Sequence, residues 1–162
     1  CTACMSCRKL DGKCIFDNDI VNKIIDKAKE ADGFVFGSPV YYAHPSGRIL
    51  SVLDRVFYAG GFAFAHKPAA AVASARRGGT TATFDVLNKY FTISQMPVVS
   101  STYWNMVHGA CPEDVMKDEE GLQTMRNIGL NMAWLLKCIK AGKDSGIEAP
   151  VADKSHRTNF IR

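Results

Sequence analysis

Apolar positions recur along the chain with two alternating patterns, and their order predicts the fold. Spacings of three and four residues between apolar side chains predict helices over 19–31, 47–58, 80–93 and 119–141. Short, continuously apolar runs predict strands at 34–36, extending toward 42, at 69–75 and at 97–100. Strands that alternate with helices in this way predict an α/β domain with right-handed crossovers and a parallel sheet.

Three predicted connections leave the carboxyl ends of these strands, where open parallel sheets bind ligands: 38–46, 76–80 and 101–109. The first carries a hydroxyl, backbone amides and two aromatic rings, in Ser38, Pro39, Val40, Tyr41 and Tyr42. These groups suit a planar ring system whose edge meets backbone N–H groups. They equally suit an ordinary strand-to-helix turn with partly buried tyrosines, and this segment alone favours neither interpretation.

The other two connections carry further groups that bind ligands. One supplies cationic donors and permissive glycines, in Arg76, Arg77, Gly78 and Gly79. The other supplies two rings, an amide and an imidazole for a substrate pocket, in Tyr103, Trp104, Asn105 and His108. The alternatives are a solvated arginine pair before a helix and aromatic packing at a subunit interface. A proton-donating role for His108 has no visible partner in the sequence.

Composition narrows the class of protein. The chain has 162 residues, enough for one domain with a sizeable core. Its net charge of +4 is scattered, and basic residues do not cluster with aromatic ones, so we expect no nucleic-acid partner. No apolar run approaches the roughly 20 residues of a membrane span, so we expect no membrane partner. Six cysteines in a chain with a regular α/β pattern indicate thiols in a reducing cytoplasm rather than a secreted disulfide scaffold.

Four of the cysteines fall within the first fourteen residues, at Cys1, Cys4, Cys7 and Cys14. Gaps of two residues bring successive thiolates around one centre, as in iron–sulfur and zinc sites. A self-contained [4Fe-4S] cluster needs four thiolates, which this loop supplies. Zinc usually takes two cysteine pairs separated by a longer stretch, so it fits less well. A loop of free thiols, or a disulfide, is the remaining interpretation.

Several of these motifs, taken in order, identify a family. They are the segment 37–42, Ser46-Gly47, Leu53-Asp54-Arg55, the turn 76–79, Tyr103-Trp104-Asn105 and the segment 120–126. Their combination resembles the flavodoxin-like NADPH-dependent FMN reductase family, and the cysteine segment resembles its iron–sulfur flavoprotein branch. Each motif alone is weak, but their order and spacing make the combination specific over residues 1 to about 140.

The resemblance implies a flavodoxin-like, three-layer α/β/α fold with a five-stranded parallel sheet, bound FMN, and a homodimer or homotetramer. FMN ring contacts carry over to 38–42 and to 76–79, where a positive charge would favour the reduced, anionic ring. Asp54 and Arg55 would be structural and would pair around the third helix. We expect the family's first strand, phosphate-binding turn, first helix and second strand to precede Cys1, so no phosphate ligand is assigned.

These expectations define a domain plan and a function. Residues 1–142 would form the FMN-binding domain, with 1–16 as its cysteine-rich loop, and 143–162 would be a tail. FMN would pass electrons from NAD(P)H or a reduced ferredoxin to an unidentified acceptor, and no side chain need act as a catalytic base. One alternative is an electron carrier with a [4Fe-4S] cluster on the four cysteines. Another is a flavodoxin-like binding module with a structural zinc loop.

Overall fold

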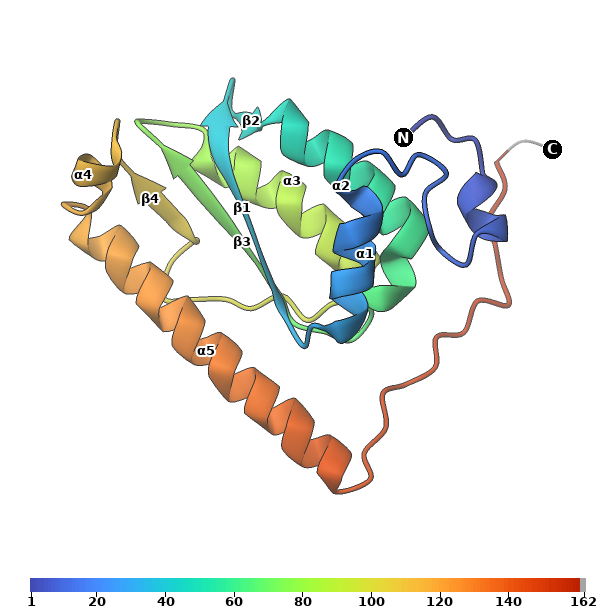
Figure 1. The fold of residues 1–162 in the computed structure, drawn as a ribbon. Coiled ribbons are helices and arrows are strands. Elements are labelled where there is room, and N and C mark those ends of the chain that lie inside the picture. Colours follow the sequence, from blue (N-terminus) through green and yellow to red (C-terminus); the bar gives the residue numbers. More distant parts are fainter. Residues whose placement is uncertain (161–162) are drawn as a thin grey trace.

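A mostly parallel sheet forms the centre of the molecule in the computed structural model, which describes residues 1–160 (Figure 1). Its strands, in spatial order, are β2 (His44–Pro45), β1 (Phe34–Tyr41), β3 (Ala69–Ala75) and β4 (Met106–His108). β3 pairs in parallel with both β1 and β4, whereas the short β2 returns antiparallel against the end of β1. The predicted strands at 34–42 and 69–75 are therefore confirmed.

The predicted helices are also confirmed, with small differences at their ends. They are α1 (Val21–Glu30), α2 (Gly47–Gly60), α3 (Thr80–Ile93) and α5 (Glu119–Asp144). Three short helical elements were not predicted: the 3₁₀ turns η1 (Ser6–Lys9) and η2 (Gly61–Ala63), and α4 (Pro112–Val115). Side-chain oxygens of Ser46 and Asp118 accept backbone N–H groups at the starts of α2 and α5, which explains where these two helices begin.

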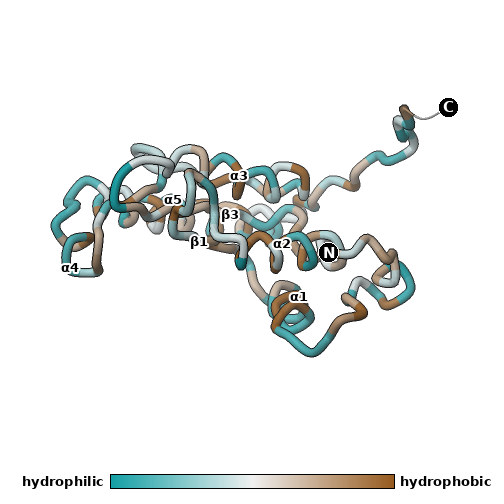
Figure 2. The backbone as a smooth tube through the Cα atoms, turned by 90° about the horizontal axis from the view of Figure 1, so that it is seen from above, coloured by the Kyte–Doolittle hydropathy of each residue, from teal (hydrophilic) through white to brown (hydrophobic). Residues whose placement is uncertain are grey.

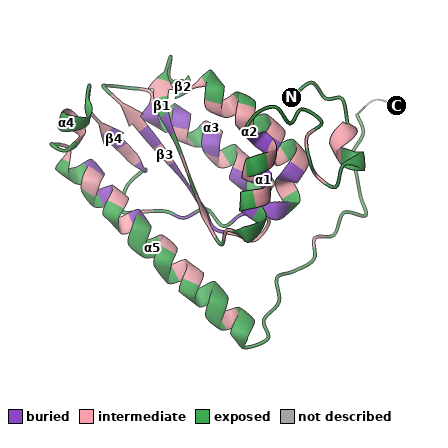
Figure 3. Ribbon diagram, viewed as in Figure 1, coloured by how far each residue is buried: buried purple, intermediate pink, exposed green. Residues whose placement is uncertain are grey.

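Helices cover both faces of the sheet. On one face, α1, α2 and α3 bury the larger core, in which Ile25, Val56 and Phe91 are fully buried against Phe36 of β1 and Ala71 of β3. On the other face α5 packs through Ile128, with Met132 and Leu135, against Ala70 and Val99. Figure 3 shows that the outward side of α5 is exposed along most of its length. This arrangement confirms the expected α/β architecture with helices on two sides of a sheet.

The predicted strand at 97–100 is wrong, and β4 takes its place. Val98 forms a single isolated bridge with Ala69, after which the chain leaves the sheet and pairs with it again at Met106. Asn105 explains the interruption, because its side-chain Nδ2 donates to the carbonyl of Ala71 at 3.0 Å. A side chain thus makes the hydrogen bond that a continuous strand would have made with its backbone.

Two segments extend away from the packed body, as the view in Figure 2 shows: the cysteine-rich loop at the N-terminal end and the chain after α5. α5 continues to Asp144, beyond the helix end predicted at residue 141. Residues 161 and 162 of the expected tail lie outside the described residues, and the division at residue 142 stays a prediction. Within residues 1–160, no helix has the length and apolar character needed to cross a lipid bilayer.

Candidate functional site

The carboxyl ends of β1, β3 and β4 lie in one row at the same edge of the sheet. Pro39 of β1 stands beside Ser74 of β3, and the next residue, Ala75, stands beside His108 of β4. The segments that follow β1 and β3 therefore start next to each other. Because ligands of such sheets bind beyond this edge, we take it as the candidate cofactor site.

A tight hairpin follows β1 and presents the first predicted segment. Tyr42 and Ala43 both adopt positive φ, at 51° and 56°, in the two-residue turn that leads into β2. Non-glycine residues rarely take this conformation, and it is found where surrounding structure imposes it, often at functional sites. The turn leaves Tyr42 fully exposed and Tyr41 more than half exposed, so both rings are free to contact a ligand.

Ser38 holds the base of this hairpin. Its side chain is buried; its Oγ accepts the backbone N–H of Ser46 at 2.9 Å and donates to the carbonyl of Pro39 at 2.9 Å. The hydroxyl is thus already used to join the end of β1 to the start of α2. Pro39 is exposed and Val40 is half-buried. The predicted contacts of 38–42 with FMN stay predictions.

Gly79 brings the second predicted segment against the first. Its φ is +97°, and a Cβ there would lie 2.7 Å from Cα of Ala43 and 2.8 Å from Cγ1 of Val40. Only glycine therefore permits both the turn and the close approach. Gly78 has open space around it, so its role differs from that of Gly79. The structure thus joins the Ser38–Tyr42 and Arg76–Gly79 segments, as expected for loops that share one ligand.

This edge is electrostatically suited to an anionic or electron-rich ligand. Arg76 and Arg77 are exposed, and neither has a hydrogen bond or ion pair with the rest of residues 1–160. α2 begins at Gly47, just after the hairpin, and α3 begins at Thr80, just after Gly79. The first N–H groups of a helix carry partial positive charge, so two helix starts and two free guanidinium groups face the same edge of the sheet.

The third predicted group is divided between two places. Tyr103 and Trp104 pack edge to face, with ring centroids 5.1 Å apart, in the excursion before β4, and both are about half exposed. They line a hollow with Phe84 of α3 that includes none of the residues 38–42 or 76–79. Because the strand lies at 106–108 rather than 97–100, these two rings lie in the segment before the strand and not in the segment that follows its carboxyl end.

Asn105 is buried and serves the sheet. Besides the bond of its Nδ2 to Ala71, its backbone carbonyl accepts the N–H of Ala73 at 2.9 Å. Its Oδ1 is buried with no hydrogen-bond partner among the described residues. This placement gives Asn105 a structural role, and a substrate contact of this residue stays a prediction.

His108 does reach the carboxyl edge, and it has the partner that the sequence did not reveal. Its backbone N–H donates to Oδ2 of Asp118 at 2.7 Å, and its Nδ1 lies 3.7 Å from the same oxygen. The other oxygen of Asp118 accepts the N–H of Gly121 at 2.9 Å. The hydrogen bonds from Gly121 and His108 hold the pKa of Asp118 below its usual value, so a carboxylate faces the imidazole.

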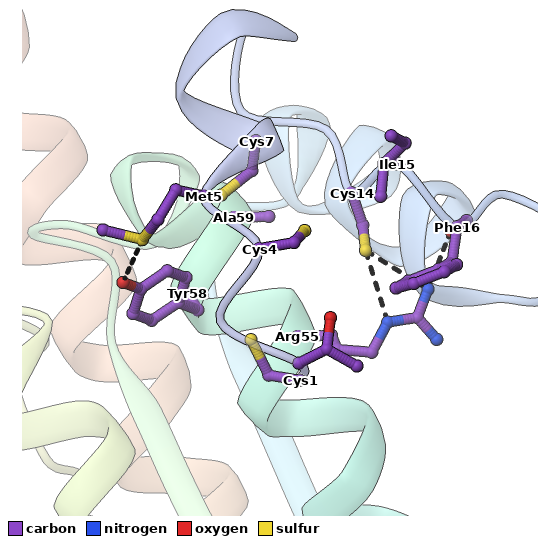
Figure 4. Close-up of a pocket in the computed structure, with 11 residues that line it drawn as sticks. Cys1, Cys4, Met5, Cys7, Cys14, Ile15, Phe16, Arg55, Tyr58 and Ala59 are labelled. Atoms are coloured by element: carbon purple, nitrogen blue, oxygen red, sulfur yellow. Dashed lines mark hydrogen bonds between the residues drawn. The ribbon is translucent and has the colours of Figure 1, made fainter.

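The four N-terminal cysteines line one small hollow, open in part to solvent (Figure 4). Ile15, Phe16, Tyr58 and Ala59 contribute to its walls. The N–H of Ala3 donates to Sγ of Cys1 at 3.4 Å, and the hydroxyl of Ser6 lowers the pKa of the Cys4 thiol. No disulfide joins any of the six cysteines, all of which are free.

The donor set of this hollow is that of an iron–sulfur site: four thiols, apolar neighbours and N–H groups directed at sulfur. The side chains are not gathered to coordination distance, however. Among residues 1–160, no three side chains of the ligating types are grouped closely enough to hold a metal ion. The chemistry of the residues therefore fits a cluster, whereas a preformed metal site is absent from the described part of the chain.

Arg55 is the residue of this region whose role the sequence did not reveal. It does not pair with Asp54, which instead accepts the hydroxyl of Tyr90 on α3 at 2.5 Å. The Arg55 guanidinium pairs with the carboxylate of Asp19 and donates to Sγ of Cys14. The signal was absent from the local pattern, because 41 residues separate Arg55 from Cys14.

Comparison with known proteins assigns the chain to a family. Residues 5–110 match the family of NADPH-dependent FMN reductases. The chain belongs to this family. An iron–sulfur flavoprotein of Methanocaldococcus jannaschii is 36% identical over 148 residues, which cover 86% of this chain and 76% of that protein. An iron–sulfur flavoprotein of Methanosarcina thermophila is 28% identical over 150 residues, covering 89% and 75% of the two chains.

Solved structures of flavodoxins share the fold of this FMN reductase family member. The flavodoxin, WrbA-like protein of Agrobacterium tumefaciens superposes with a TM-score of 0.53 at 19% identity, covering 65% of this chain and 69% of that one. A flavodoxin from the domain Archaea gives a TM-score of 0.51 at 18% identity, covering 70% and 71%. The flavodoxin-like α/β/α fold expected from the sequence is therefore confirmed.

Proposed function

We propose that this protein is an FMN-dependent NAD(P)H oxidoreductase of the flavin- or quinone-reductase type. Membership of the family supports a flavoprotein oxidoreductase. The assignment of FMN as the cofactor rests on the contact of Gly79 with Val40 and Ala43. This contact joins the two predicted FMN-binding segments at the carboxyl edge of the sheet. When bound there, FMN would supply transfer of a hydride or of single electrons.

In this proposal the chain binds and orients the ring system. The hairpin presents Tyr41 and Tyr42 as aromatic surfaces, and Ser38 fixes the hairpin to the start of α2. Arg76 and Arg77 would supply positive charge beside the ring, which favours its reduced, anionic form. His108, oriented by Asp118, would stand at the same edge as a group able to hold a proton near the acceptor.

The proposal is tested by NAD(P)H oxidation. The protein is supplied with FMN and an artificial quinone acceptor, and NADPH and NADH are compared under anaerobic conditions. We expect oxidation that depends on both protein and FMN, and a loss of rate in Arg76→Gln/Arg77→Gln. Lys137→Gln/Lys143→Gln, toward the end of α5 that points away from this edge, removes the same number of charges and serves as the control. Negligible rates with both nicotinamides would contradict a reductase.

A second candidate is an iron–sulfur flavoprotein that carries electrons, with a [4Fe-4S] cluster on Cys1, Cys4, Cys7 and Cys14. The shared hollow of these four thiols supports it, as does the similarity of the chain to two iron–sulfur flavoproteins. A reduced ferredoxin, rather than a nicotinamide, would then be the electron donor. A structural zinc loop is the alternative for the same thiols.

Iron and acid-labile sulfide analysis after anaerobic purification separates these alternatives. The cluster requires iron and sulfide in equal amounts, both lost in Cys7→Ser, with Cys111→Ser as the control because Cys111 lies on the loop before α4. Zinc without sulfide would support the structural loop, and neither element would indicate free thiols.

We further propose that the protein acts in the cytoplasm as a homodimer or homotetramer. Leu130 and Trp134, one turn apart on the outer side of α5 and each about two-thirds exposed, support association of copies. Light scattering coupled to size-exclusion chromatography tests the assembly. Conversion of the protein from oligomer to monomer in Trp134→Glu is the expected result, and an oligomer that this change leaves intact would place the interface elsewhere.

A further inference from the structure

Arg55 lies on α2 but its side chain ends inside the cysteine-rich segment. Its side chain is 16% exposed, because α2 and the segment 14–19 enclose it. The guanidinium donates to Sγ of Cys14 from both Nε and Nη2, each at 3.3 Å (Figure 4). Two N–H groups of one planar fork therefore meet one sulfur.

The same guanidinium is held in place by three further contacts. Nη2 donates to the carbonyl of Phe16 at 2.7 Å, Nη1 pairs with the carboxylate of Asp19, and the ring of Phe16 lies 5.6 Å from the guanidinium carbon. The ion pair holds the pKa of Asp19 below its usual value, so the pair is charged at neutral pH. With its position fixed from several directions, the fork has little freedom to turn away from Cys14.

Cys14 is also fixed by its backbone. Its N–H donates to Oδ1 of Asn22 at 2.8 Å, and its carbonyl accepts Nδ2 of Asn22 at 2.9 Å. The groups that donate to Cys1 and that lower the pKa of Cys4 lie in the same loop as those cysteines, whereas the donor to Cys14 lies on a helix that belongs to the core. Cys14 is thus the cysteine through which the loop is joined to the body of the protein.

We infer that Arg55 is a positioning residue: it fixes Sγ of Cys14 in the hollow and, through two N–H donors to that sulfur, sets a more positive reduction potential for the cluster that the four cysteines would hold. The second part rests on the [4Fe-4S] cluster of the proposed function. Hydrogen bonds to ligand sulfur stabilise the more negative, reduced state, which raises the reduction potential. A lysine cannot replace this role, since its single ammonium group does not present two fixed donors.

Three variants of the full chain separate the contributions. Arg55→Gln removes the charge and the fork, and Arg55→Lys keeps only the charge. Asp19→Asn weakens the ion pair but keeps both donors to Cys14. Arg126→Gln is the control, because the side chain of Arg126 is exposed on α5 and has no hydrogen bond or ion pair within the described residues.

The first readout is the midpoint potential of the cluster, measured by a redox titration followed by electron paramagnetic resonance, apart from any turnover. We expect a negative shift in Arg55→Gln and in Arg55→Lys, a smaller shift in Asp19→Asn and none in Arg126→Gln. An unchanged potential in Arg55→Gln, with full iron and sulfide content, would overturn the inference.

The second readout uses the protein without iron and tests positioning alone. Trypsin can cut the loop after Arg8, Lys9 and Lys13, all of which are exposed. We expect cleavage at these sites to be several-fold faster in Arg55→Gln than in Arg126→Gln, and equal rates would refute positioning. If the wild-type protein takes up no iron or sulfide, the cluster proposal and the effect on potential fall together, while the cleavage rates still decide whether Arg55 fixes the loop.

Discussion

At the scale of single residues, Gly79 decides whether the candidate cofactor site forms. It is the point where the turn after β3 meets the hairpin after β1, and it combines a positive φ with a contact too close for a side chain. Its neighbour Gly78 has neither constraint. Two adjacent glycines that look equivalent in the sequence therefore differ in what they do.

Substitution of these two glycines by alanine tests the contact, with Gly78 as the matched control for Gly79. Gly79→Ala forces a Cβ into Ala43 and Val40 and places alanine in the left-handed region, so we expect a loss of at least about 1 kcal/mol in the free energy of unfolding. We also expect weaker FMN binding, because the two loops must separate. Gly78→Ala should change stability by less than about 0.5 kcal/mol. Urea unfolding and FMN fluorescence titration measure both effects, and equal behaviour of the two variants would contradict the contact.

Asp118 joins the start of α5 to the end of β4. It caps the helix through Gly121 and accepts the N–H of His108, so Asp118→Ala should lower the free energy of unfolding by about 1 kcal/mol. Asp118→Asn keeps an acceptor and should lose less. Urea unfolding midpoints provide the measurement, and an unaltered midpoint in the alanine variant would argue against the capping role.

The same carboxylate predicts a pH dependence. The pKa of Asp118 is lowered in the folded protein, so its charged form is stabilised there relative to the unfolded chain. This contribution is fully present above the unfolded value of about 3.9 and is lost as the pH falls through the lower folded value. The stability difference between wild type and Asp118→Asn should therefore shrink between neutral pH and about pH 3. A stability difference that grew on acidification would contradict the lowered pKa of Asp118 in the folded protein.

At the scale of elements, the interrupted segment 97–108 is the part of the sheet that depends on a side chain. Asn105→Ala removes the donor to the carbonyl of Ala71, which is buried, and should cost about 1–3 kcal/mol. Asn131→Ala removes a similar bond, from Nδ2 to the carbonyl of Ser100, at an exposed position and should cost less. Thermal unfolding compares the two, and an Asn131→Ala variant as unstable as Asn105→Ala would show that burial does not decide the cost.

This segment is also the part of the sheet that could not be predicted from the sequence. The helices and the strands at 34–41 and 69–75 follow from local periodicity, because each buries one face or a whole run of residues. The strand at 97–100 was misplaced because Pro97-Val98-Val99 has the composition of a strand, whereas the pairing is taken up by Met106–His108 after a side chain has intervened. Such a replacement depends on a contact with Ala71, 34 residues away, which no local pattern contains.

The candidate site likewise contains features that the sequence predicts and features that it does not. The segments after β1 and β3 were predictable, since their strand ends and glycines are local features. The hairpin with positive φ at Tyr42 and Ala43 was not, because neither residue is the glycine or asparagine that marks such turns. The contacts of Arg55 and Asp118 were also missed, since their partners, Cys14 and His108, are brought to them only by the fold.

At the scale of the whole molecule, the fold places one candidate redox region at the start of α2 and the other beside its second half. The helix starts at Gly47, beside the hairpin at the carboxyl edge of the sheet, and carries Arg55, Tyr58 and Ala59 to the hollow lined by the four cysteines. One rigid helix thus connects the region proposed for FMN to the region proposed for a cluster. Under the proposed function, both regions would serve one path of electrons.

The central claim is that FMN binds to this protein and accepts electrons there from a nicotinamide. The most direct test is the anaerobic visible absorption spectrum of the full chain, recorded after incubation with FMN, removal of the unbound flavin by gel filtration, and addition of NADPH or NADH. We predict that flavin absorption stays with the protein and is bleached by at least one of the two nicotinamides. Protein that emerges without flavin, or bound flavin that neither nicotinamide bleaches, would contradict the claim.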